Sequence, residues 1–191
     1  VVQDDRLHRR PQLHLFRVND RHMIIRMESP EVFYPGQETV VVGSAEIEQL
    51  KRVALTSPKK RARLCTHQSP VDDLHEMLIV LPHDAYVRPH RHLGKAESLS
   101  ILEGEADIVL FNDDGTVRTA IQMGPHGSGK SFYYRLSQPV YHTVIVRSQL
   151  VLFHEVTEGP FRREQTEYAT WSPDECDQPR IDQFLNSLPS E

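Results

Sequence analysis

The stretch that decides the fold is PHRHLGKAESLSILEG, residues 89–104. His90 and His92 are two residues apart, so on an extended segment both imidazoles leave the same face. Glu97 follows a turn at Gly94, near the start of the next expected strand, and its carboxylate can swing back toward them. Imidazole nitrogens and a carboxylate oxygen are natural ligands of a divalent metal ion. The stretch therefore predicts a metal site built on neighbouring strands.

The segments around this stretch are short and rich in strand-forming residues. Between two of them, Asp113, Asp114 and Gly115 supply a tight hairpin turn. Many short strands without crossover helices indicate an antiparallel sandwich or barrel. The expected strands lie within residues 23–27, 39–42, 61–67, 75–82, 85–92, 97–104, 105–112, 116–123, 131–137, 141–147 and 149–156.

One helix is expected before the main run of strands. It begins at Ser44, a favourable N-cap residue, and Ile47, Leu50 and Val53 follow at helical spacing. Pro58 closes the segment. The helix is expected to pack one face on the main body.

The chain of 191 residues is expected to form one domain. Residues 1–22 mix charges and histidines without a sustained period and are expected to be a loosely ordered lead-in. Residues 23–173 contain the strands. Residues 174–191 are expected to be an acidic C-terminal tail with at most a short amphipathic turn at 181–188.

Composition excludes several classes of function. The 22 basic and 27 acidic residues give a net charge of −5, which leaves no basic field for nucleic acid. No apolar stretch approaches the roughly 18 residues that span a bilayer, so no membrane partner is expected. Cys65 and Cys176 are too few for a disulfide framework, which favours a cytoplasmic location.

A second stretch, GPHGSGKS at residues 124–131, has the letters of a phosphate-binding loop. Such a loop requires a helix immediately after it, because the helix N-terminus points at the phosphates. Here three aromatic residues lie in a strand-like run, and Pro139 follows shortly afterwards. We therefore expect a connecting loop and no nucleotide site.

The spacing of His90, His92, Glu97 and Gly104 resembles the first signature of the cupin superfamily: His-x-His, Glu after four residues, and Gly after six more. His142, in SQPVYHTVIV, stands where the second cupin signature places a histidine. The resemblance implies an all-β fold, a cupin jelly-roll barrel of short antiparallel strands with one N-terminal helix. It also implies that His90, His92, Glu97 and His142 bind one metal ion.

A narrower resemblance covers residues 24–173. YVRPHRHLGKAESLSILEGEADIVLFNDDG, then YHTVI, then LVLFHEVTEGPF and the ending Trp171-Ser172-Pro173 are similar to WbuC-type cupin metalloproteins. Bacterial members of that family occur among genes of surface-polysaccharide biosynthesis. The resemblance to cupins also allows a homodimer, through paired sheets or an exchanged segment such as 23–42.

Four protein ligands leave one or two positions open on a five- or six-coordinate ion, as in working rather than structural metal sites. Ligation by nitrogen and oxygen without thiolate suits Fe, Mn, Ni, Co or Zn, and the sequence does not choose among them. Lys95, Tyr133 and Arg135 are candidates for contacting a substrate. Tyr133 and Arg135 share one face of their strand and Tyr134 takes the other, and the sequence leaves open which face is internal.

Three functions compete for such a site, each with a small-molecule partner. The first is a metal-dependent isomerase or epimerase acting on a sugar or a sugar-nucleotide derivative. The second is an Fe(II)-dependent dioxygenase, which three-His, one-Glu cupins often are. The third is a non-catalytic binder in which the metal only orients a carbohydrate or metabolite.

Overall fold

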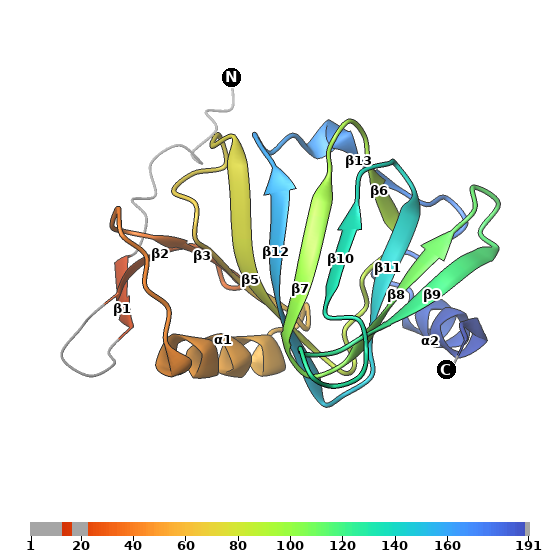
Figure 1. The fold of residues 1–191 in the computed structure, drawn as a ribbon, viewed down its shortest axis with the longest axis horizontal. Helices are drawn as coiled ribbons and strands as arrows, with labels where there is room; N and C mark the ends of the chain where they lie inside the picture. The colour runs from red at the N-terminus through yellow and green to blue at the C-terminus, as the bar shows by residue number, and fades with distance from the viewer. Residues whose placement is uncertain (1–12, 17–22, 190–191) are drawn as a thin grey trace, which may run out of the picture.

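Two β-sheets form the body of the protein in the computed structural model, which describes residues 13–16 and 23–189 (Figure 1). In this part of the chain the larger sheet has eight strands, in the spatial order β1 (Leu13–Phe16), β2 (Met23–Ser29), β3 (Val32–Pro35), β4 (Ala62–Cys65), β5 (Leu74–Pro82), β12 (Leu150–Glu158), β7 (Glu97–Glu103) and β10 (Tyr133–Leu136). The smaller sheet has five, in the order β13 (Thr166–Tyr168), β6 (His90–His92), β11 (Tyr141–Val146), β8 (Ala106–Phe111) and β9 (Val117–Met123).

The main apolar core lies between the two sheets. Met77 of β5 and Phe153 of β12 belong to the same buried cluster as Ile108 of β8 and Val144 of β11. Because side chains alternate across a strand, each of these strands turns one set of residues toward the other sheet. The expectation of a mainly β fold is confirmed. One strand pair departs from the antiparallel pattern, since β3 pairs with β4 in parallel.

Helix α1 (Ser44–Thr56) covers the outer face of the larger sheet and confirms the expected helix. Leu50 and Ala54 of this helix pack with Leu64 and Val80 in a second buried cluster. The N-cap is Gly43 rather than Ser44, and the Gly43 N–H donates to the carboxylate of Glu46 at 2.8 Å. Ser44 is therefore the first residue of the helix and not its cap, so the helix begins one position earlier than expected.

A second helix, α2 (Gln178–Ser187), corrects the expectations of a single helix and of a tail with at most a short turn. The side chain of Asp177 accepts from the Arg180 N–H and caps its start. Phe184 and Leu188 belong to a third apolar cluster with Phe111 and Trp171, on the face of the smaller sheet that is turned away from the larger one. Figure 1 shows α2 beside β8 and β9. The spacing of the apolar residues 181, 184, 185 and 188 is helical, and this packing lets the segment extend beyond one turn.

Other segments also differ from expectation. Residues 39–42 form no strand, because Val40 and Val42 pack on the cluster under α1 without pairing to a neighbouring strand. Strand β13 lies in a segment where no strand was expected, and within the expected lead-in residues 13–16 form β1. The rest of that lead-in, residues 1–12 and 17–22, lies outside the described part of the chain.

The two turns singled out in the sequence behave as expected. Asp113, Asp114 and Gly115 connect β8 to β9 as a hairpin. The glycine-rich stretch 124–131 leads into β10 and not into a helix, and Lys130 forms an ion pair with Glu105. Among the described residues, neither helix combines the length and apolarity needed to cross a membrane.

Candidate metal centre

Three histidines converge where β6 and β11 run side by side in the smaller sheet. His90 and His142 are direct cross-strand partners, and His92 leaves β6 on the same face as His90. One ring nitrogen from each of the three imidazoles lies within 4.8 Å of the others. The structure thus brings together the three histidines that the sequence predicted as ligands.

Hydrogen bonds on the far side of two of the rings favour the tautomer that a metal site needs. Nδ1 of His90 lies 2.8 Å from the Arg88 carbonyl oxygen, and Nδ1 of His142 lies 3.0 Å from the Val140 carbonyl oxygen. A carbonyl only accepts, so Nδ1 carries the hydrogen and Nε2 of the neutral ring keeps its lone pair. The donor set therefore fits a divalent ion held by neutral imidazoles.

Glu97 reaches the histidine cluster from β7, in the opposite sheet. Its carboxylate lies 2.9 Å from Nε2 of His142 and 3.2 Å from Nε2 of His92. Its side chain is only 11% exposed. A divalent cation among the nitrogens, or a proton on His142, can each compensate this buried negative charge, so protons and metal compete for the site.

Electrostatics in the cluster follow from burial and from this carboxylate. Burial, reinforced by the neighbouring His142 and His92, lowers the pKa of His90 to about 3. Burial alone would raise the pKa of Glu97, but the charges and hydrogen bonds of His142 and His92 outweigh it and lower that pKa. Burial would lower the pKa of His142, and Glu97 overcomes this and raises it.

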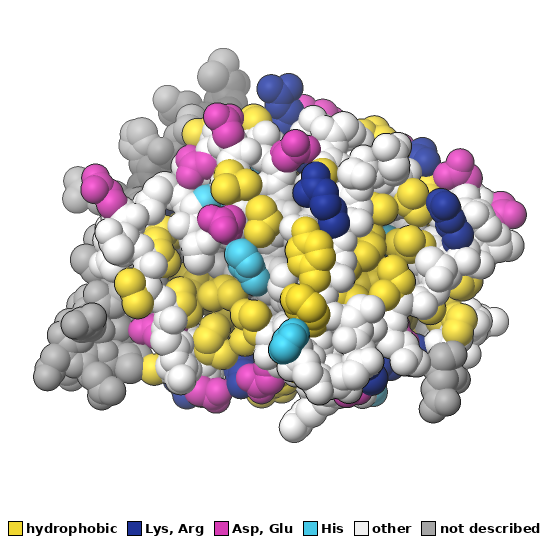
Figure 2. All heavy atoms as spheres, viewed as in Figure 1, with side chains coloured by type: hydrophobic (Ala, Val, Ile, Leu, Met, Phe, Trp, Pro, Cys, Tyr) yellow, Lys and Arg dark blue, Asp and Glu magenta, His cyan; other side chains and the backbone are white. Residues whose placement is uncertain are grey.

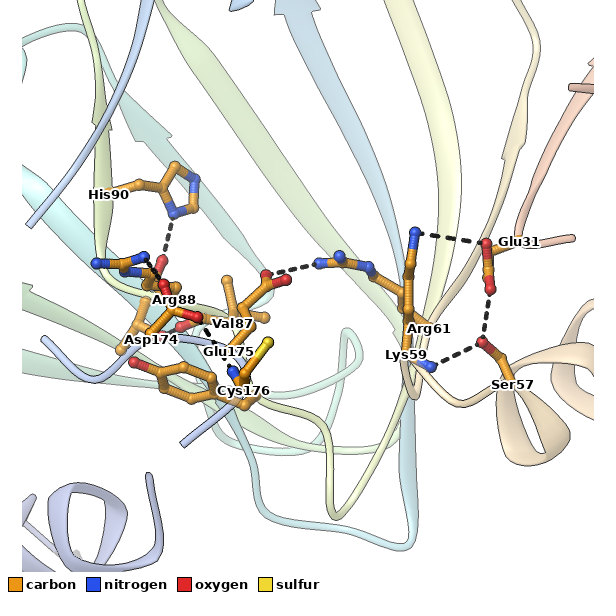
Figure 3. Close-up of polar contacts among 12 residues, drawn as sticks. Glu31, Ser57, Lys59, Arg61, Val87, Arg88, His90, Asp174, Glu175 and Cys176 are labelled. Atoms are coloured by element: carbon orange, nitrogen blue, oxygen red, sulfur yellow. Dashed lines mark hydrogen bonds and ion pairs between the residues drawn. The ribbon is translucent and has the colours of Figure 1, made fainter. Parts of the chain in front are cut away.

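The segments around β6 hold the site from both sides. Oγ1 of Thr166 on β13 lies 3.3 Å from Nδ1 of His92. Arg88, whose backbone orients His90, forms an ion pair with Asp174 (Figure 3). The adjacent Glu175 pairs with Arg61, just before β4 in the other sheet (Figure 3). The segment after Pro173 therefore links the two sheets below the histidines.

Two polar residues of the larger sheet face the same interior, and neither was predicted as a site residue. Glu155 of β12 alternates with the core residues Val151 and Phe153, and Tyr134 pairs with the core residue Leu99. No hydrogen bond or ion pair to the Glu155 carboxylate is found among the described residues. The sequence did carry a signal, a carboxylate at an apolar-face position in the strand 149–156.

Burial and nearby charge set the chemistry of these two groups, which lie on the core-facing side of the larger sheet as Glu97 does. Burial, with the charge of Glu97, raises the pKa of Glu155 to about 7, against the opposing effect of Arg63. The hydroxyl of Tyr134 is buried without a hydrogen-bond partner in the described part of the chain. A carboxyl group whose pKa lies near 7 is suited to exchanging a proton with a bound molecule, and a hydroxyl without a hydrogen-bond partner is suited to orienting one.

The structure does not bring Tyr133 and Arg135 to this interior. Both are exposed, and they lie opposite Ser100 and Ser98 on the outer face of the larger sheet. Hydrophobic side chains gather on the surface where β12, β7 and β10 are drawn (Figure 2). The open question about this strand is settled by its register, because Tyr134 pairs with the buried Leu99.

Lys95 lies beside the centre, between His92 and Glu97 along the chain. Its ammonium donates to the Pro160 carbonyl oxygen at 2.7 Å, and its burial and the charge of Arg162 lower its pKa. It lines a cavity of about 460 Å³. The cavity walls are formed by Asp73, Gly94, Lys95, Glu158, Gly159, Pro160, Arg162 and Gln165.

Comparison with known proteins gives a family without an assigned activity. A family described as a domain of unknown function, DUF6016, matches residues 42–123, which is less than half of the chain. No curated protein matches the chain.

Solved structures similar to the chain include cupin-superfamily proteins. A sugar phosphate isomerase from a cupin superfamily of Silicibacter pomeroyi is 20% identical with a TM-score of 0.40, and the match covers 52% of this chain and 59% of that one. KdgF from Halomonas sp. is 16% identical with a TM-score of 0.42, covering 57% and 86%. The recombinant pro-11S globulin of pumpkin is 13% identical with a TM-score of 0.47, covering 59% and 29%. The chain thus spans less than two thirds of the length of the first and third of these proteins, and identities this low say nothing of activity.

Proposed function

We propose that this protein is a WbuC-type cupin with a jelly-roll barrel that binds one divalent metal ion, Fe, Mn, Ni, Co or Zn. We further propose that it acts as an isomerase or epimerase on a small molecule derived from a sugar or a sugar nucleotide, in surface-polysaccharide metabolism. The fold assignment is supported by two sheets that enclose one core and by the signature spacing of residues 90, 92, 97, 104 and 142.

One observation carries the proposal: three imidazoles and a carboxylate from two facing sheets meet at one point. The ring nitrogens of His90, His92 and His142 lie within 4.8 Å of one another, and Glu97 contacts two of these rings. Four protein ligands leave one or two positions open on a five- or six-coordinate ion, and nitrogen and oxygen ligands without thiolate suit the five metals named. Such an ion would supply Lewis acidity toward a carbonyl or hydroxyl oxygen of the substrate.

The chain's own residues support proton transfer rather than oxidation. An isomerase or epimerase removes a proton from carbon and returns it, and this requires a group that is neither firmly ionised nor firmly protonated. Glu155 faces the interior that Glu97 faces, and no hydrogen bond or ion pair to its carboxylate is found among the described residues. We assign it the proton-transfer step, with the hydroxyl of Tyr134 orienting the substrate.

The proposal is tested first by metal content. Protein loaded separately with each of the five metals is expected to retain about one ion per chain, by elemental analysis after dialysis. His142→Ala is expected to lose it. His154→Ala, which removes an imidazole from the outer face of β12, is the matched control and should retain the ion. Equal metal content in His142→Ala and the parent protein would contradict the site.

Turnover distinguishes the proposed reaction from its competitors. The metal-loaded protein is incubated with a panel of sugar nucleotides and sugar phosphates, with and without oxygen. Product formation without oxygen, lost in His90→Ala, supports the isomerase or epimerase. Oxygen uptake by the iron-loaded protein would instead favour a dioxygenase, and tight binding without product would favour a binder.

A further inference from the structure

We propose that the cavity beside the metal centre binds a hydroxylated anion, such as a sugar acid or a sugar phosphate, and so holds the charged end of the substrate. This inference rests on the proposed function for its biological meaning, although the binding itself does not require the metal. The cavity volume of about 460 Å³ lies in the range of sites for small molecules.

The cavity adjoins the metal ligands along two segments of the chain. Gly94 and Lys95 in its wall stand between His92 and Glu97, each two residues from one of these ligands. Two residues span at most about 7 Å. On another side, Gln165 precedes Thr166, whose hydroxyl lies 3.3 Å from Nδ1 of His92. A ligand the size of a monosaccharide can therefore reach from the cavity toward the ion.

Two cations face the cavity with hydrogen-bonding capacity left over. Lys95 uses one donor, toward the Pro160 carbonyl oxygen, and an ammonium has three. The guanidinium of Arg162 makes no hydrogen bond or ion pair with any described residue. Lys95 and Arg162 share the wall with the carboxylates of Asp73 and Glu158, and an anion placed between the two cations would use their free donors.

Acceptors in the same wall indicate that the anion also carries hydroxyl groups. Oε1 of Gln165 is buried with no hydrogen-bond partner in the described part of the chain. A buried amide oxygen without a hydrogen-bond donor favours a ligand that donates a hydrogen bond to it. The Asp73 carboxylate offers a second acceptor, whereas Glu158 is already engaged by the Ala96 N–H at 2.8 Å. Mixed donors and acceptors suit a sugar acid or sugar phosphate better than a neutral sugar.

Isothermal titration calorimetry tests the inference with three named probes: glucose 6-phosphate, gluconate and glucose. Each is titrated into the full chain in zinc-loaded and in metal-free form, because gluconate can also bind a metal directly. Both anions are expected to bind at least about tenfold more tightly than glucose, because one hydrogen bond to a charged group is enough to give a tenfold difference in affinity. A preference between the anions identifies the charged group as phosphate or carboxylate.

Substitutions locate the binding. Arg162→Gln and Lys95→Gln are expected to weaken binding of the preferred anion about tenfold or more. Arg163→Gln is the matched control, because Arg163 is the next residue, is exposed and does not line the cavity. Its affinity should equal that of the parent, and thermal unfolding verifies that all variants are folded.

Three results would overturn the inference: no binding of either anion, glucose binding as tightly as the anions, or parent-like affinity in Arg162→Gln. Any of these with one zinc ion per chain would leave the proposed metal site intact. Conversely, anion binding that depends on Arg162 in a chain that retains no metal would refute the proposed function alone.

Discussion

Oε1 of Glu97 lies 2.9 Å from Nε2 of His142, and this contact joins the two sheets. Glu97 belongs to β7 of the larger sheet and His142 to β11 of the smaller one. A metal ion bound here would have ligands in both sheets. Because the unfolded chain does not preform such a site, metal binding is expected to be coupled to stability.

Metal removal should therefore lower the thermal stability of the protein. With free metal at about 100 times its dissociation constant, linkage stabilises the fold by about 2.7 kcal/mol. Glu97→Gln should abolish most of this increment, because it removes the only carboxylate shown to contact the rings among the described residues. Differential scanning calorimetry with and without chelator measures this metal-dependent stabilisation in the parent and in the variant. Glu103→Gln, at the exposed end of β7, should keep the parent's response.

The two faces of β10 should respond differently to substitution. Tyr134→Phe removes a buried hydroxyl without a partner in the described structure, so the free energy of unfolding should stay unchanged or rise by up to about 1 kcal/mol. If that hydroxyl orients the substrate, KM should rise. Tyr133→Phe and Arg135→Gln lie on the outer face and should leave metal content and KM at parent values. Impaired turnover in these outer variants alone would contradict the inward role of Tyr134.

Glu155→Gln should separate catalysis from metal binding. Proton transfer by a positioned group contributes about 10²–10⁴-fold, so kcat should fall by this factor while metal content stays at the parent level. In the metal-free protein the raised pKa of about 7 means that Glu155 favours folding at low pH, and this contribution is lost as pH rises toward 7. The variant should therefore gain stability relative to the parent at pH 8 but not at pH 5, by urea denaturation. Loss of bound metal in Glu155→Gln would instead make Glu155 a ligand.

Acid should destabilise the protein through His75 as well as through the metal centre. The rings of His75 and His67 stack with centroids 4.1 Å apart, and burial, His67 and Lys95 lower the pKa of His75. The unfolded state therefore binds the proton first, and stability falls as pH drops below about 6.5. One such proton contributes up to about 1.4 kcal/mol per pH unit. His75→Gln should therefore reduce the dependence of the unfolding free energy on pH.

Alanine substitution at two glycines separates the energetic cost of a steric clash from the cost of a positive φ angle. Gly104 has φ +78°, and a Cβ there would lie 2.1 Å from the Leu150 carbonyl oxygen. Gly94 has φ +69° with nothing within 4 Å of its Cβ position. Gly94→Ala should cost about 1 kcal/mol of unfolding free energy, and Gly104→Ala about 1–3 kcal/mol more. Equal losses in chemical denaturation would contradict the close approach at Gly104.

Local spacing predicted more of the site than of its surroundings. His90, His92 and Glu97 lie within one short stretch, so strand alternation and one turn bring them together. His142 came from the cupin signature, because its place beside His90 depends on the register of β11 against β6. Sheet register also determines which face is internal, and for this reason Tyr133 and Arg135 were chosen while Tyr134 and Glu155 were missed.

The fold was predicted best where pattern alone is sufficient. Most of the expected strands and the helix after Gly43 are present, because hydrophobic period determines them locally, although only residues 90–92 of the expected strand 85–92 form one. Residues 39–42 have strand-like composition, but no neighbouring strand pairs with them. Helix α2 was underestimated, because its apolar face is stabilised by Phe111 and Trp171 from distant parts of the chain.

The packing of α2 has a practical consequence for anyone shortening the chain. A protein that ends at Pro173 matches the extent of the family resemblance, yet it would strip Phe184 and Leu188 from Trp171 and Phe111. The aromatic surface exposed by this truncation would promote self-association during purification. The same cut would remove the carboxylates that pair with Arg88 and Arg61. Expression of the protein should therefore include α2. Proteolytic cleavage before α2 should yield a product that precipitates and not a soluble, folded domain.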